Sequence, residues 1–116
     1  MEISLETDGP VALVRVAGEA AHADGPSIAQ YLRVARENGA VRAVVDLSAC
    51  PAVATTVVSI LLREGSALAG AGGGLSLCGL SSQNPFLRGA VDEGRLRNYR
   101  SFDEGAAAER RLACAG

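Results

Sequence analysis

Two adjacent hydroxyl side chains, Thr55 and Thr56, stand at the start of an apolar helical segment. The Thr55 hydroxyl is predicted to cap this helix by accepting a hydrogen bond from a free amide of the first turn. Capping does not explain the polar stripe that Thr56 begins, whose other members are Ser59, Arg63 and Ser66. A phosphate on Thr56 would be favoured by the helix dipole and the unpaired amides, so the pair is interpreted as a phosphoacceptor or contact site.

Three acidic or basic side chains offer weaker signals of chemistry. His22 and Asp24 lie close together, and a histidine oriented by a carboxylate can act as a general base. No companion nucleophile is evident from the sequence, so His22 is read as a surface loop residue. Asp46 follows a buried strand, where it either serves a site directly or accepts hydrogen bonds from nearby backbone amides.

The glycine run at 70–74 and the arginine groups favour structural roles. A phosphate loop needs Gly-Lys-Ser/Thr after the glycines and should open a helix, whereas this run closes a helix and precedes a strand. We therefore interpret it as a helix stop. The arginines, in a chain without an overall basic balance, are expected on a solvated face; they are Arg95, Arg97, Arg100, Arg110 and Arg111.

Length and composition predict one globular domain over residues 1–116. The chain is 48% hydrophobic and 21% charged, with a net charge of −2, which argues against broad nucleic-acid binding. One histidine and three well-separated cysteines give no metal or disulfide framework, so we expect no metal, no cofactor and a reducing cytoplasm. No signal peptide is expected, and glycines and a proline interrupt the longest uncharged stretch, which argues against membrane insertion.

Hydrophobic periodicity predicts the order β-β-α-β-α-β-α-β-α. Strands are expected at 3–5, 11–16, 43–47, 75–78 and 98–100, and helices at 26–38, 55–68, 85–93 and 101–112. The helix at 55–68 is expected to bury Val58, Leu61, Leu62, Gly65 and Leu68, and the helix at 85–93 to bury Phe86, Leu87, Ala90 and Val91. This alternation predicts an α/β domain with a mixed, mostly parallel sheet, one antiparallel N-terminal hairpin and about four helices.

The combination of motifs resembles the STAS domain family, the fold of bacterial anti-sigma factor antagonists. The matching stretches are Gly18-Glu19, Val44-Val45-Asp46-Leu47-Ser48, the helix at 57–63 and Leu75-Ser76-Leu77-Cys78-Gly79. The order of elements matches over residues 2–112. The strand ending in Val-Val-Asp-Leu-Ser, followed some seven residues later by a hydroxyl pair that opens an apolar helix, is the more specific part of the resemblance.

The resemblance implies that Thr56 is the phosphoacceptor and Thr55 its neighbour. In the family, a partner kinase that is also the anti-sigma factor phosphorylates the second hydroxyl of an Asp-Ser/Thr-Ser/Thr-Gly segment. This chain has Ala54 where the family has the aspartate, and Val57 where it has the glycine. Ala21 also stands where a second acidic residue is frequent. These changes remove charge that a kinase would use, so phosphorylation is optional and constitutive binding is an alternative.

We therefore expect a protein-binding regulatory domain and not an enzyme. The expected partner is an ATP-binding, kinase-type anti-sigma factor, and the domain itself is expected to be a monomer or weak homodimer. The expected contact residues are Pro51, Ala54, Thr55, Thr56, Ser59, Arg63, Ser66, Ala21, His22 and Asp24. One alternative is a non-phosphorylated STAS scaffold subunit of a transporter ATPase or a stress-signalling complex. Another is a STAS domain that binds a small molecule or nucleotide between its sheet and helices.

Overall fold

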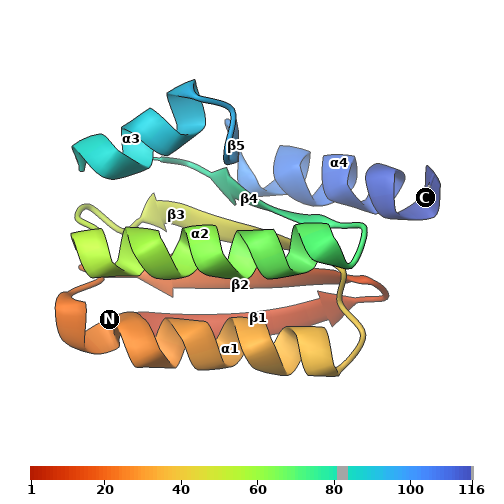
Figure 1. The fold of residues 1–116 in the computed structure, drawn as a ribbon, viewed down its shortest axis with the longest axis horizontal. Coiled ribbons are helices and arrows are strands. Elements are labelled where there is room, and N and C mark those ends of the chain that lie inside the picture. Colours follow the sequence, from red (N-terminus) through yellow and green to blue (C-terminus); the bar gives the residue numbers. More distant parts are fainter. Residues whose placement is uncertain (81–83, 116) are drawn as a thin grey trace.

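A five-stranded sheet forms the centre of the structure, a computed structural model that describes residues 1–80 and 84–115. Figure 1 shows the order of the elements along the chain. They are β1 (Glu2–Asp8), β2 (Val11–Ala17), the short 3-10 helix η1 (His22–Asp24), α1 (Gly25–Glu37), β3 (Arg42–Ala49), α2 (Thr55–Gly70), β4 (Gly74–Cys78), α3 (Pro85–Asp92), β5 (Arg97–Tyr99) and α4 (Phe102–Ala115).

The strands follow their sequence order across the sheet, β1-β2-β3-β4-β5. β1 and β2 are antiparallel, and every later neighbouring pair is parallel. The hairpin turns at Gly9, whose φ of +59° lies in the left-handed region that favours glycine. Each parallel pair is joined through a crossover that contains a helix, as parallel strands require. The predicted α/β domain, with one N-terminal antiparallel hairpin and an otherwise parallel sheet, is confirmed.

Helices cover both faces of the sheet. α1 and α2 lie side by side across one face (Figure 1), and α4 packs against the other face. β2 serves both layers, because Val14 and Val16 pack toward α1 and α2 while Val11 and Leu13 pack toward α4. This two-sided burial explains why the strand is apolar at nearly every position.

α2 begins one residue earlier than a Thr55 cap requires. Ala54 occupies the N-cap position in an extended conformation, with φ −68° and ψ 150°, and Thr55 is the first helical residue. The prediction that the Thr55 hydroxyl caps the helix is therefore wrong. The reason is a loop contact: the Ala54 amide donates to the carbonyl of Ala20 at 2.8 Å, which keeps Ala54 extended up to the start of the helix.

The buried face of α2 includes a carboxylate that the hydrophobic pattern did not indicate. Its buried residues are Val57, Val58, Leu61, Glu64 and Leu68, whereas the predicted Leu62 and Gly65 are only half-buried. Glu64 Oε2 lies 3.0 Å from Arg36 Nη2 of α1. A carboxylate is buried at low cost only when it is paired, so Glu64 is an ionic contact between the two helices.

Two helices begin with the side-chain caps that their sequences predict, and two other predicted boundaries differ from the structure. Asn84 caps α3 by accepting from the amides of Phe86 at 2.9 Å and Leu87 at 3.3 Å. The Ser101 hydroxyl accepts from the Glu104 amide at 3.2 Å, as its spacing predicts for the start of α4. β5 is Arg97–Tyr99, one residue earlier than expected, and α4 continues beyond Leu112 to Ala115.

Along the described residues, no helix combines the length and the hydrophobicity that a membrane crossing requires.

Candidate functional site

Two loops meet at the amino-terminal end of α2. The loop after β2 and the loop after β3 are joined by the hydrogen bonds Ala20 N to Ala52 O, at 2.9 Å, and Ala54 N to Ala20 O, at 2.8 Å. Between them, Val53 and Ala20 form an isolated parallel bridge, and both side chains are buried. The sequence places these loops about 30 residues apart, and the backbone bonds fix them as one ridge beside the start of α2.

Thr55 and Thr56 are both exposed in the first turn of α2. Thr56 Oγ1 lies 2.9 Å from His22 Nδ1 in η1, which is hydrogen-bond distance. The sequence showed no nucleophile near His22, and the structure corrects this by placing a hydroxyl against the ring. The Thr55 hydroxyl accepts from Asn84 Nδ2 at 3.4 Å.

Asp24 has a different role from the one that a catalytic dyad would require. Its Oδ2 accepts from the backbone amide of Ala21 at 2.9 Å, across the start of η1. Among the described residues, no hydrogen bond joins Asp24 to His22. The carboxylate therefore holds the shape of the loop that presents His22, and Thr56 is the partner of the imidazole.

The start of α2 is suited to negative charge. Ala54 offers no capping side chain, and the first turn contains no acidic residue. The first amides of a helix lack intrahelical partners, and the helix dipole places partial positive charge there. A phosphate on the Thr56 hydroxyl would lie beside these amides and the His22 ring, so the local electrostatics accept it without unfolding the helix.

The contact residues expected from the sequence are placed as follows. Two of them are half-buried, Ala54 and Asp24. The others are exposed: Pro51, Ala21, His22, Thr55, Thr56, Ser59, Arg63 and Ser66. We use the name tip surface for the loop ridge together with the first turn of α2, which comprises residues 21–24 and 51–56. Ser66 lies ten residues beyond Thr56, about 15 Å along the helix, so the far end of the stripe is remote from the tip surface.

Sequence reasoning did not connect Asn84 and Phe86 with the tip surface. Asn84 Nδ2 donates to the Val53 carbonyl at 2.8 Å as well as reaching Thr55, so it ties the start of α3 to the ridge. Phe86, two residues later, was predicted to lie on the buried side of its helix. It is 63% exposed, while Leu87 and Ala90 of the same helix are buried. Asn84 caps α3 two residues before Phe86, and the aromatic ring lies in solvent.

Asp46 and the cysteines serve the structure. Asp46 Oδ1 accepts from the Ser48 amide at 3.0 Å, which is the backbone role weighed for a strand-end aspartate. Burial, aided by nearby Asp46, raises the pKa of the Cys78 thiol to about 12, and burial also raises the pKa of Cys50. Both side chains therefore remain protonated thiols near neutral pH. The described residues contain no cluster of side chains that could hold a metal ion.

Solved structures with a similar fold include anti-sigma factor antagonists. SpoIIAA in its unphosphorylated form is 17% identical, with a TM-score of 0.77, and the match covers 95% of this chain and 98% of that one. An anti-sigma factor antagonist from Mycobacterium paratuberculosis is 22% identical, with a TM-score of 0.73 and coverage of 94% and 95%. Phosphorylated SpoIIAA from Bacillus is 13% identical, with a TM-score of 0.72 and coverage of 92% and 99%.

These likenesses identify the fold. No protein-family model and no curated protein sequence matches the chain. The similarity to solved structures nevertheless extends over nearly the whole length of both partners. The chain has the STAS-like fold of the anti-sigma factor antagonists, as the resemblance in its sequence implies.

Proposed function

We propose that this domain is a partner-switching regulator that docks through its tip surface onto an ATP-binding, kinase-type anti-sigma factor. The observation that carries the proposal is the exposed Thr56 hydroxyl at the amino end of α2, held by His22 within a ridge of two loops. The domain acts by binding, with no reaction of its own. Phosphate on Thr56 would add about two negative charges to the contact surface and weaken the docking.

The structural neighbours support a regulatory role. Two of them are described as anti-sigma factor antagonists. SpoIIAA is known both without and with phosphate, and this chain is similar to each form. A fold that persists in both states suits a switch that changes surface charge and leaves the architecture intact.

The residues at the tip surface modify the proposal. Ala54 and Ala21 carry no charge, so the acidic groups that would help a kinase to orient magnesium are absent from these two positions. His22 supplies a hydrogen-bond partner for Thr56 instead. Docking in the unmodified state is therefore the primary function we propose, and phosphorylation of Thr56 is its control where a competent kinase is present.

Phe86 is expected to be an anchor of the docked complex. Exposed aromatic side chains that become buried in an interface often dominate its binding energy. Phe86→Ser should weaken binding to the anti-sigma factor at least about tenfold, because truncating such an anchor costs about 2 kcal/mol or more. Since the ring lies in solvent, the free energy of unfolding should change by less than about 0.5 kcal/mol. Isothermal titration and urea denaturation measure the two effects separately.

A matched control is Val34→Ser in α1, which also removes an exposed apolar side chain. It should leave the affinity unchanged, because Val34 lies in the last turn of α1, at the opposite end of that helix from η1. If the Phe86 variant binds with unchanged affinity, α3 is not part of the docking surface, and the contact consists of the loops and Thr56.

The scaffold alternative uses the same fold with another partner. The uncharged Ala54 and Ala21 suit a subunit that is never phosphorylated. Purification of the tagged chain from its native cell distinguishes the two: a transporter ATPase in stoichiometric amount would replace the sigma-pathway proposal, whereas a kinase-type anti-sigma factor would support it.

A further inference from the structure

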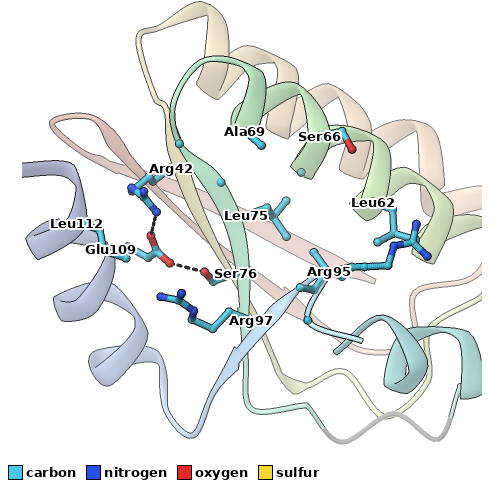
Figure 2. Close-up of a pocket in the computed structure, with 15 residues that line it drawn as sticks. Arg42, Leu62, Ser66, Ala69, Leu75, Ser76, Arg95, Arg97, Glu109 and Leu112 are labelled. Atoms are coloured by element: carbon cyan, nitrogen blue, oxygen red, sulfur yellow. Dashed lines mark hydrogen bonds and ion pairs between the residues drawn. The ribbon is translucent and has the colours of Figure 1, made fainter. Parts of the chain in front are cut away.

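The open edge of the sheet forms a pocket far from the tip surface. β5 pairs with β4 only at Ser76, Leu77 and Cys78, so the beginning of β4 at Gly74 and Leu75 has a strand neighbour only on the β3 side. A cavity of about 530 Å³ lies at this edge, between the carboxyl half of α2 and α4. Its volume is within the range of pockets that hold small molecules. Figure 2 shows this pocket with the residues that line it.

A buried carboxylate forms one side of the pocket. Glu109 of α4 is 1% exposed. Its Oε2 accepts from Arg42 Nη1 at 2.8 Å, and its Oε1 accepts from the hydroxyl of Ser76 and from that of Tyr99, the latter at 3.3 Å. A carboxylate has about four acceptor positions, so three donors nearly saturate it. Glu109 therefore neutralises Arg42 and is not free to bind a ligand.

Two other guanidinium groups line the pocket with little compensation. Arg97 Nη1 donates to the neutral hydroxyl of Tyr99 at 3.2 Å, and within the described part of the chain it forms no ion pair. Arg95 lies 3.9 Å from Glu93, a pair in which both side chains are more than half exposed. Such exposed pairs contribute little, and each guanidinium retains unused N–H donors.

The two guanidinium groups lie at different ends of the pocket. Figure 2 shows Arg97 beside Ser76 and Glu109, while the Arg95 side chain extends toward Leu62 on α2. Aliphatic side chains form much of the remaining lining, and none of the described lining residues is aromatic. The aliphatic members are Leu62, Leu75, Leu96 and Leu112. The described lining therefore offers no aromatic ring on which a nucleobase could stack.

We propose that this pocket binds a short aliphatic dicarboxylate, with one carboxylate on Arg97, the other on Arg95 and the carbon chain across Leu75. After Glu109 offsets Arg42, the lining carries a surplus of two positive charges, one at each end, which a dicarboxylate matches. Arginine binds carboxylates through paired N–H donors. The site lies outside the tip surface, since its nearest lining residue on α2, Leu62, is six residues beyond Thr56, about 9 Å along the helix.

The test is a titration of the ¹⁵N-labelled chain with glutarate and with butyrate, which has the same apolar body without the second carboxylate. Glutarate should perturb the amide signals of Gly74, Leu75 and Ser76 with a dissociation constant below about 1 mM, and butyrate should bind at least about tenfold more weakly. Arg95→Gln and Arg97→Gln should each abolish this difference between the two acids. Arg33→Gln, an exposed arginine of α1, should preserve it.

Other outcomes would overturn the proposal. Equal binding of glutarate and butyrate, or signals that move at Thr55 and Thr56 instead of at β4, would exclude a two-ended site in this pocket. Tighter binding of glycerol 3-phosphate or AMP would assign the arginines to phosphate. A second variant guards against altered folding: Ala69→Glu adds a negative charge on the exposed α2 wall and should also weaken glutarate binding. An unaltered affinity in this variant would count against the site.

Discussion

Replacing Glu109 with alanine is expected to lower the free energy of unfolding by about 3–5 kcal/mol, the cost of breaking a buried ion pair from one side. The carboxylate is the shared acceptor of Arg42, Ser76 and Tyr99, which come from β3, β4 and β5. Its removal leaves the half-buried guanidinium of Arg42 and the buried Ser76 hydroxyl without a partner. Because a domain of this size is stable by about 5–15 kcal/mol, urea denaturation should show a large fall in the midpoint.

Two further variants distinguish a lost ionic contact from general damage to α4. Arg111→Ala, at an exposed position of the same helix, should change the free energy of unfolding by less than about 0.5 kcal/mol. The double variant with Arg42→Leu and Glu109→Leu removes both charges and should be more stable than Glu109→Ala alone. A Glu109→Ala chain as stable as the wild type would show that this carboxylate does not hold the strands together.

Gly73→Ala is expected to be the most disruptive single methyl addition in the chain. A Cβ at this position would lie 1.5 Å from the carbonyl oxygen of Val41, which is backbone and cannot turn aside. The same oxygen accepts from the Gly74 amide at 3.1 Å, so relief of the clash would break the first contact between β3 and β4. We expect the free energy of unfolding to fall by at least about 3 kcal/mol, the upper range for overpacking.

Gly70→Ala is the matched control, because nothing lies within 4 Å of a Cβ built at that last residue of α2. It should leave the stability unchanged or raise it by up to about 1 kcal/mol, since alanine favours the helix more than glycine does. Thermal unfolding of both variants provides the comparison. Similar melting temperatures of the two variants would contradict the prediction, because they would mean that the backbone at the start of β3 and β4 can move apart at little cost in free energy.

The order of the elements could be predicted from the sequence because each boundary depends on local chemistry. Asn84 before Pro85 and Ser101 before Glu104 give helix starts, and both caps are present in the structure. Gly39, with φ +97°, follows the C-cap residue Asn38 of α1, in the left-handed region that favours glycine. The buried carboxylates were missed because their partners are distant in sequence. Glu109 is 67 residues from Arg42, and a charged residue in an alanine-rich helix is ordinarily assigned to solvent.

Only part of the candidate site could be predicted from the sequence. Spacing and resemblance indicated Thr55 and Thr56, and the structure places both in solvent at the start of α2. Nothing local could indicate that His22, 34 residues away, lies against the Thr56 hydroxyl. The prediction of a Thr55 cap was wrong because a contact distant in sequence, between Ala54 and Ala20, decides where the helix begins.

The most direct test of the docking proposal is the affinity of the purified chain for the kinase-type anti-sigma factors encoded in its own genome. Wild type is predicted to bind one of them, and Thr56→Glu to bind it at least about tenfold more weakly, because a new charge is placed in a desolvated contact. Thr7→Glu adds the same charge at an exposed position of β1 and should have no effect. Equal affinity of the Thr56→Glu chain and the wild type would contradict the account.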